Sequence, residues 1–212
     1  MNRLYNCCLL GAMFSVSLLA QWIPYTADYT ESATIFDPNG MIVSHSLRTG
    51  TRSRGSNGSE ITSSAKVDNG AAVLVSRSAQ FLDSATGSVY KILYQGGSIT
   101  LMGTSPVPLR HHVLSGPPLG TATVAGLPCT EYPIKTPSST SSGKVCFYEA
   151  GDIFLKYAYR SETPSKSWRE TDIELSDVKL GVEPDPAVFA LPAGFKSTGS
   201  LGLQCSSCAL KK

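Results

Sequence analysis

Six cysteines are the residues of this 212-residue chain with the most evident chemical potential. Cys129 and Cys146 each lie in a candidate strand, on either side of a Ser/Thr-rich loop at residues 137–143. A bridge between them closes a loop of roughly 18 residues, which is worth about 3 kcal/mol by a chain-entropy argument. We therefore predict a structural disulfide between these two cysteines.

Cys205 and Cys208 form a Cys-Ser-Ser-Cys motif close to the end of the sequence. Redox motifs of this spacing normally open a helix whose N-terminus stabilises the thiolate, and no strand–helix unit precedes this one. A zinc site would need two further ligands, and no Cys or His pair is near in sequence. The pattern favours a local disulfide, with thiol-redox or metal chemistry and an intermolecular bridge as alternatives.

Other catalytic patterns are missing from the sequence. His111 and His112 are adjacent, so in an extended segment their side chains point in opposite directions and do not readily share a metal. Glu170, Asp172 and Glu174 alternate along one predicted strand, which places them on one solvent-facing side. No nucleophile elbow, zinc-protease helix or phosphate-binding glycine loop is present. We expect no catalytic residue, no bound metal and no cofactor.

The first twenty residues are typical of a secretory signal peptide. Arg3 is the only charged residue before Asp28, and an apolar run at 7–20 follows it. A transmembrane helix needs about 20 apolar residues, and this run is shorter, so we expect no stable membrane span. The predicted organisation is a signal peptide at 1–20, one β-rich domain at 21–196 and a flexible tail at 197–212. Periplasmic or secreted localisation follows, together with an oxidising environment for the later cysteines.

Charge is almost balanced over the whole chain, with 18 basic and 16 acidic side chains. This balance argues against nucleic acid as a partner, because neutralising phosphates needs a concentrated basic surface. The distribution is nevertheless uneven, since residues 48–110 are mainly basic and residues 149–185 mainly acidic. We expect solvated strand faces of opposite sign, with a steering surface for a charged partner as the alternative.

Alternation of apolar and polar residues dominates the pattern from residue 25 onward. Residues 25–35 alternate cleanly, and Asp37-Pro38-Asn39-Gly40 then supplies the residues of a tight turn. The same sequence of strand and turn recurs to residue 180. The fold class predicted is mainly β, a curved antiparallel sheet of about ten strands forming a half-barrel or open barrel. Short helical turns are expected at 78–83 and 184–189.

Residues 173–195 read IELSDVKLGVEPDPAVFALPAGF, an alternating strand, an acidic-proline turn, a short apolar turn and Leu-Pro-Ala-Gly-aromatic. This segment resembles the C-terminal part of the bacterial outer-membrane lipoprotein carriers (LolA/LolB-like proteins) and their uncharacterised periplasmic relatives. The resemblance covers about 25 residues and implies a curved sheet over an apolar interior. The chain departs from those carriers by entering its first strand soon after Trp22, without the helices that cover their barrel.

The resemblance implies an exported, non-enzymatic domain that binds a lipid, a lipoprotein or another apolar component of the cell envelope. Binding would come from buried apolar surface, at about 25 cal/mol per Å². The alternatives are a structural or interaction domain with a closed core and no ligand, and a minor thiol-redox role of the C-terminal cysteines. The aromatic and aliphatic residues on the predicted strands that could line such a site are Phe81, Tyr90, Ile92, Tyr94, Phe147, Phe154, Tyr157 and Tyr159.

Overall fold

The computed structural model describes residues 22–68, 71–104, 114, 116–135 and 142–198. In these residues twelve strands form one sheet, with the order β12-β6-β5-β4-β3-β2-β1-β11-β10-β9-β8-β7. Neighbouring strands are antiparallel except β12 and β6, which are parallel. The strands are β1 (Tyr25–Phe36), β2 (Ile42–Arg54), β3 (Glu60–Asp68), β4 (Ala71–Asp83), β5 (Ser88–Leu93), β6 (Ser98–Thr104), β7 (Gly120–Val124), β8 (Leu127–Lys135), β9 (Ser142–Tyr148), β10 (Ile153–Glu162), β11 (Trp168–Leu180) and β12 (Lys196–Thr198).

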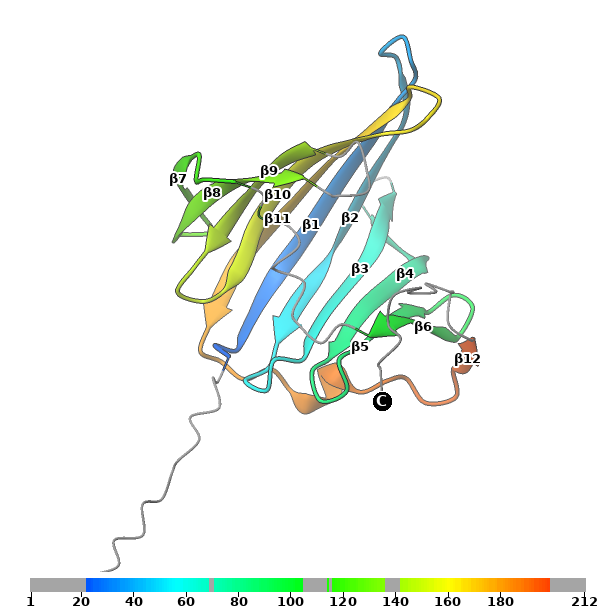
Figure 1. Ribbon diagram of the computed structural model, residues 1–212. Coiled ribbons are helices and arrows are strands. Elements are labelled where there is room, and N and C mark those ends of the chain that lie inside the picture. The colour runs from blue at the N-terminus through cyan, green and yellow to red at the C-terminus, as the bar shows by residue number, and fades with distance from the viewer. Residues whose placement is uncertain (1–21, 69–70, 105–113, 115, 136–141, 199–212) are drawn as a thin grey trace, which may run out of the picture.

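The sheet curls into an open half-barrel, in which β7–β9 and β4–β6 form the two sides and β1 and β2 lie between them (Figure 1). The mainly β, curved antiparallel fold predicted from the alternation is therefore confirmed. The chain turns back between strands where the sequence carries residues that favour tight turns. The Asp37 carboxylate accepts the backbone N–H groups of Asn39 and Met41, and Gly40 takes a φ of 87°.

One of the two predicted helical turns is correct. Pro186–Phe189 forms a 3-10 turn, η2, capped by the Asp185 carboxylate, which accepts the N–H of Ala187. The other prediction, at 78–83, is wrong because these residues belong to β4. There Ala79 and Phe81 alternate into a buried cluster, so strand pairing and packing override any local preference for a turn.

Two apolar clusters hold the described sheet together. The first lies around β1, β10 and β11 and is formed by Tyr25, Ala27, Tyr29, Cys129, Cys146, Ile153, Leu155 and Leu175. The second lies on the β3–β5 side and is formed by Ile61, Ala79, Phe81 and Ile92. Phe189 of η2 and Phe195 pack against the second cluster, so the segment after β11 covers the outside of the sheet there.

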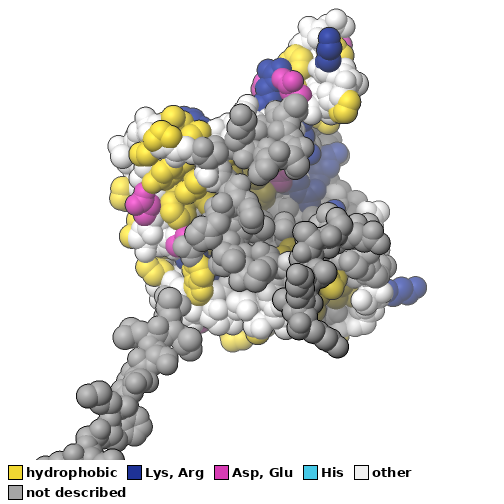
Figure 2. Space-filling model, in the orientation of Figure 1, with side chains coloured by type: hydrophobic (Ala, Val, Ile, Leu, Met, Phe, Trp, Pro, Cys, Tyr) yellow, Lys and Arg dark blue, Asp and Glu magenta, His cyan; other side chains and the backbone are white. Residues whose placement is uncertain are grey.

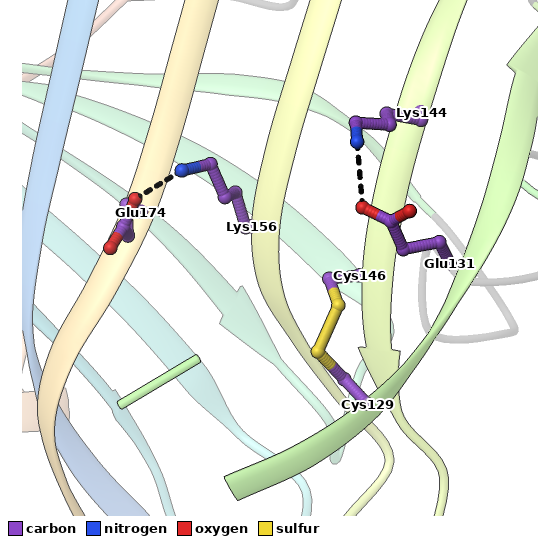
Figure 3. Close-up of a disulfide and its surroundings, with 6 residues drawn as sticks. All are labelled: Cys129, Glu131, Lys144, Cys146, Lys156 and Glu174. Atoms are coloured by element: carbon purple, nitrogen blue, oxygen red, sulfur yellow. Dashed lines mark hydrogen bonds and ion pairs between the residues drawn. A yellow bond between two sulfur atoms is a disulfide. The ribbon is translucent and has the colours of Figure 1, made fainter. Parts of the chain in front are cut away.

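The predicted disulfide between Cys129 and Cys146 is present, and it joins β8 to β9 (Figure 3). Both cysteines are only 4% exposed, and their Cα atoms are 5.4 Å apart. They are not directly opposite, because Cys146 pairs with Glu131 in the strand register. The diagonal offset explains how the bridge forms although the connecting loop is not centred between the cysteines. Cys205 and Cys208 lie outside the described residues, as do the predicted signal peptide and most of the predicted tail.

No helix within the described ranges has both the length and the apolar character needed to cross a bilayer.

Candidate functional site

A cleft of about 490 Å³ opens on the inner face of the curled sheet. Side chains from β6 and from β10 both line it, although seven strand spacings separate these strands in the sheet. In a flat sheet they would lie about 34 Å apart, at about 4.8 Å per spacing. The curvature is therefore what brings the lining residues around one space.

The cleft has a polar floor and two apolar walls. The floor comes mainly from β2, β3 and β4, whose cleft-lining side chains are Arg48, Arg52, Arg54, Glu60, Thr62, Ser64, Ser78 and Gln80. One wall carries Leu82, Val89 and Met102 from β4, β5 and β6, together with the charged Lys91 of β5. The facing wall carries Ile153, Phe154, Tyr157 and Ile173 from β10 and β11.

The alternation of β2 places its three arginines on the floor. Arg48, Arg52 and Arg54 have the same parity, and a strand turns residues of one parity to one face. Gly50 shares this parity, and a Cβ there would lie 1.9 Å from the carbonyl oxygen of Ser63. The two backbones therefore approach too closely at this point for any residue except glycine.

Arg52 forms a buried ion pair with Glu60 at the centre of the floor. Its Nε and Nη2 lie 2.9 and 2.5 Å from the Glu60 Oε1 atom, and the two side chains are 15% and 23% exposed. The Tyr25 hydroxyl donates to the other carboxylate oxygen at 3.3 Å. Burial lowers the pKa of Arg52, but Glu60 and the neighbouring tyrosines Tyr25 and Tyr157 together raise it above its usual value. The guanidinium therefore stays charged.

Arg54 is 4% exposed and ties two loops to the floor. Its guanidinium donates to the backbone carbonyls of Ile23, Gly151 and Asp152. Burial lowers the pKa of this guanidinium from its usual value, although its N–H groups have acceptors. The segment before β1 and the turn before β10 are thus held by one side chain.

Two aromatic rings pack against the Arg54 guanidinium. The Cζ atom of Arg54 lies 5.1 Å from the Trp22 ring centroid and 5.0 Å from that of Tyr25. Such cation–π contacts are stronger when the cation is removed from water. Arg54 therefore fixes both the start of the first strand and one end of the cleft.

Arg48 also donates hydrogen bonds to protein acceptors. Its Nη2 donates to the carbonyls of Ser64 and Ser76 at 3.1 and 2.9 Å and to the Ser78 hydroxyl at 2.8 Å. These contacts lie next to the irregularity in β3 between Ser64 and Lys66, where the register with β4 shifts. The three arginines thus shape and charge the floor, while their N–H groups point to protein acceptors.

Aromatic packing builds the wall on β10. The Phe154 ring lies 5.2 Å from that of Tyr157 and 4.9 Å from that of Phe147, measured between centroids. The predicted ligand-lining residues therefore divide into two groups. Phe154 and Tyr157 line the cleft, Phe147 supports Phe154, and Tyr159 follows Tyr157 on the same face of β10.

The other four predicted residues lie on the β3–β6 side of the sheet. Phe81 and Ile92 are buried in the second apolar cluster, and Tyr90 and Tyr94 pack against it. The Phe81 ring lies 6.4 Å from that of Phe189 in η2. This cluster is filled by the protein itself, whereas the cleft faces the opposite side of the same strands.

Sequence reasoning missed the polar floor. Residues 48–54 were expected on a solvated strand face, whereas Arg54 is buried and Arg52 is paired inside the cleft. The spacing of the arginines at every second or fourth residue predicts a shared face. It does not show that this face is the inner one, because that depends on how the whole sheet curls.

The acidic residues of β11 lie on a solvent-facing side of the strand, as predicted. Glu170, Asp172 and Glu174 are exposed on the face of β11 opposite the cleft, and Glu174 pairs with Lys156 at 2.6 Å (Figure 3). Over the described ranges, no group of three or more His, Cys, Asp or Glu side chains could hold a metal ion.

Alkaline pH is expected to destabilise the cleft through its buried tyrosines. Burial raises the pKa of Tyr157 to about 12, and burial also raises the pKa values of Tyr25 and Tyr29. An unfolded tyrosine has a pKa of about 10, so the folded protein holds these protons more tightly. The stabilisation is complete below about pH 10 and is lost as pH rises through the folded pKa values.

Tyr157 alone is expected to make the free energy of unfolding fall by about 1.4 kcal/mol per pH unit between pH 10 and 12. Urea unfolding from pH 8 to 11.5 measures this fall. The matched variant Tyr157→Phe should show a shallower fall over the same range. Identical pH profiles for the two proteins would contradict the assignment.

No protein-family model and no curated protein sequence matches this chain. Solved structures similar to it include MucB in complex with MucA, at 12% identity and a TM-score of 0.44, with 81% of this chain and 55% of that chain covered. PNGF-II is similar at 12% identity and a TM-score of 0.46, with 86% of this chain and 32% of that chain covered. The chain thus spans just over half of MucB and about a third of PNGF-II.

A domain from Vibrio parahaemolyticus, described as belonging to outer membrane lipoprotein sorting, is similar at 10% identity and a TM-score of 0.38. The match covers 80% of this chain and 90% of that domain. Its description names lipoprotein sorting, the class of protein that residues 173–195 resemble, and the similarity is distant and at low identity.

Proposed function

We propose that this protein is an exported, non-enzymatic binding domain whose inner cleft holds an apolar ligand such as a lipid chain or the lipid moiety of an envelope component. The observation that carries this proposal is the shape and lining of the cleft. Its volume of about 490 Å³ falls within the range of about 300–1,000 Å³ usual for ligand sites. Two apolar walls face each other across it.

The lining suits an elongated ligand with an apolar body. Phe154, Tyr157 and Ile173 on one wall face Leu82 and Met102 on the other, so a chain between them would contact apolar atoms on both sides. Each buried methylene contributes about 0.8 kcal/mol to such binding. The polar floor has its own internal partners, so it does not need the ligand to complete its ion pair.

Two features that are typical of exported proteins also support the proposed binding function. The chain begins with the pattern of a secretory signal peptide, and its described part contains a buried disulfide, which forms in oxidising compartments. Apolar ligands that must cross an aqueous space outside the cytosol need a sheltered site of this kind.

Titration with a fluorescent fatty acid tests the proposal, with saturable binding near one equivalent as the expected result. A Gln80→Trp variant places a large ring in the cleft from an exposed position on β4 and should weaken binding about tenfold or more, a loss of about 1.4 kcal/mol. Ser176→Trp is the matched control, since Ser176 is an exposed strand residue on the opposite face of β11.

Absence of saturable binding to the wild-type protein would favour the rival interpretation, a structural or interaction domain without a ligand. Equal loss of binding in both tryptophan variants, or no loss in Gln80→Trp, would place the ligand elsewhere than in the cleft.

A further inference from the structure

Three neighbouring polar side chains of the cleft have no partner in the described part of the protein. Thr62, Gln80 and Lys91 lie directly opposite one another on β3, β4 and β5 in the strand register, and all three line the cleft. Within the described ranges, no hydrogen bond or ion pair joins their side chains to another group. Residues directly opposite each other in antiparallel strands have Cβ atoms about 5 Å apart, so the three groups are continuous. We call these three residues the polar row.

Carboxylates that line the cleft do not neutralise Lys91. Glu60 accepts two hydrogen bonds from Arg52, and the Glu31 carboxylate accepts one from Arg169. Over the part of the chain that the structure describes, no ion pair includes Lys91. Its ammonium group therefore presents a positive charge to the cleft without an acidic partner.

The cleft as a whole carries more positive than negative charge. Four cationic and three acidic side chains line it. The third acid, Asp152, lies beside Arg54 of β2, and β2 is three strands away from the β5 strand that carries Lys91. In the space-filling view, hydrophobic side chains gather over β7–β9, and Lys and Arg side chains form a group beside β2 and β3 (Figure 2). The excess of cations favours a ligand with negative charge.

The polar row borders one apolar wall of the cleft on the same two strands. Along β4, Gln80 is followed two positions later by Leu82, and along β5, Val89 comes two positions before Lys91. Leu82 pairs with Val89 in the register, as Gln80 pairs with Lys91. Two residues of a strand extend about 6.8 Å, so the cleft changes from apolar to polar over that distance.

A purely apolar ligand would suit the wall but not the polar row. Filling the cleft displaces water from Thr62, Gln80 and Lys91, and a polar group that loses water without a new partner costs free energy. The cost is greatest for the ammonium group, because a charge loses the most solvation. The ligand therefore needs an acceptor group at the polar row and an apolar part beside it.

We propose that the ligand of the cleft is an amphiphile whose anionic head group, a carboxylate or a phosphate, binds at the polar row while its chain extends between Leu82 and Phe154. This inference rests on the proposed binding function and adds the class of ligand to it. Lys91 supplies the charge, and the Gln80 amide and the Thr62 hydroxyl donate hydrogen bonds to the head-group oxygens.

Two probes that differ only in the head group test the proposal, a fluorescent fatty acid and the methyl ester of the same acid. At neutral pH and low salt, the wild-type protein should bind the acid about fivefold more tightly than the ester, as expected for one ion pair in a partly hydrated site. The ratio of the two dissociation constants is the readout, because burial of the chain contributes equally to both. This ratio should fall in about 0.5 M NaCl, since salt screens the charge.

Substitutions of Lys91 separate charge from shape. Lys91→Gln should lower the ratio from about five to about one, mainly by weakening binding of the acid. Lys91→Arg should keep the ratio near the wild-type value, because the positive charge remains. Lys156→Gln is the matched control and should leave the ratio unchanged, since Lys156 is 42% exposed and pairs with Glu174 on the outer face.

Competition distinguishes an amphiphile from a free anion. Dodecyl phosphate should displace the fluorescent acid, whereas inorganic phosphate at the same concentration should not, because it has no chain to bury. Equal displacement by the two competitors would overturn the proposal. A ratio near one for the wild type, or an unchanged ratio in Lys91→Gln, would overturn it while leaving the cleft as a ligand site. Absence of saturable binding of both probes would contradict the proposed function itself.

Discussion

Replacing Arg54 by alanine is expected to lower the free energy of unfolding by about 3–5 kcal/mol. The guanidinium is 4% exposed and donates to three backbone carbonyls, those of Ile23, Gly151 and Asp152. Removing it leaves these acceptors without their donor, at a cost of about 1–3 kcal/mol for each one that water cannot reach. The packing of the side chain against two aromatic rings is lost as well.

Urea unfolding at neutral pH measures this loss. Arg54→Lys should recover only a small part of it, because an ammonium group cannot reproduce the flat fork that reaches three acceptors. Arg160→Ala is the matched control. Arg160 also lies over a ring, that of Trp168 at 4.2 Å, but it is 44% exposed, so its removal should cost about 1 kcal/mol or less. Similar losses for Arg54→Ala and Arg160→Ala would contradict the anchoring role of Arg54.

Replacing Glu60 by leucine is expected to destabilise the protein by about 3–5 kcal/mol, because it leaves the Arg52 charge buried without its partner. The Tyr25 hydroxyl loses its acceptor in the same variant. The double variant Arg52→Met/Glu60→Leu removes both charges and replaces them with apolar groups. It should regain most of the lost stability, since replacing a whole buried ion pair is often neutral.

The double-mutant cycle separates the coupling of the pair from the cost of each substitution. Denaturant unfolding of the wild type, the two single variants and the double variant provides the four values. Additive effects of the single substitutions would show that Arg52 and Glu60 do not act as a buried pair. Lys156→Leu/Glu174→Leu is the comparison on the outer face, where the pair is 42% and 50% exposed and a coupling of about 1 kcal/mol or less is expected.

These two sets of contacts have a common consequence for the cleft. Arg54 holds the segments that flank one end of it, and the Arg52–Glu60 pair joins β2 to β3 across its floor. The floor therefore keeps its shape through internal contacts, and the apolar walls are presented without needing a ligand to order them. Such preorganisation lowers the cost of binding.

Local sequence pattern was sufficient for most of the strands, the turn after β1 and the disulfide. Alternation at residues 25–35 predicts β1, because a strand turns every second residue inward, and Asp37 to Gly40 predicts the turn that follows. The loop between Cys129 and Cys146 predicts their bridge, because chain reversal brings neighbouring strands together. In each case the interaction joins residues that are close in sequence, so a short window contains the information.

The face that each strand presents to the cleft was decided by tertiary structure. Phe81 and Phe154 both lie in alternating segments with aromatic neighbours, yet Phe81 is buried beneath η2 and Phe154 lines the cleft. Parity assigns a residue to one of two faces, but the sense in which the sheet curls determines which face is inner. That curvature depends on the twist of all the strands and on the segment after β11 that covers the outside.

The polar floor shows the same division between local and distant information. The spacing of Arg52 and Arg54 along β2 reveals a shared face, whereas the carbonyl partners of Arg54 depend on contacts across the fold. Glu60 lies only eight residues after Arg52 and meets it across the β2–β3 hairpin, whereas the carbonyls of Gly151 and Asp152 are nearly a hundred residues away from Arg54. Sequence alone therefore predicted a chain of antiparallel strands, and the tertiary structure decided that three arginines of β2, instead of facing solvent, form the floor of a cleft.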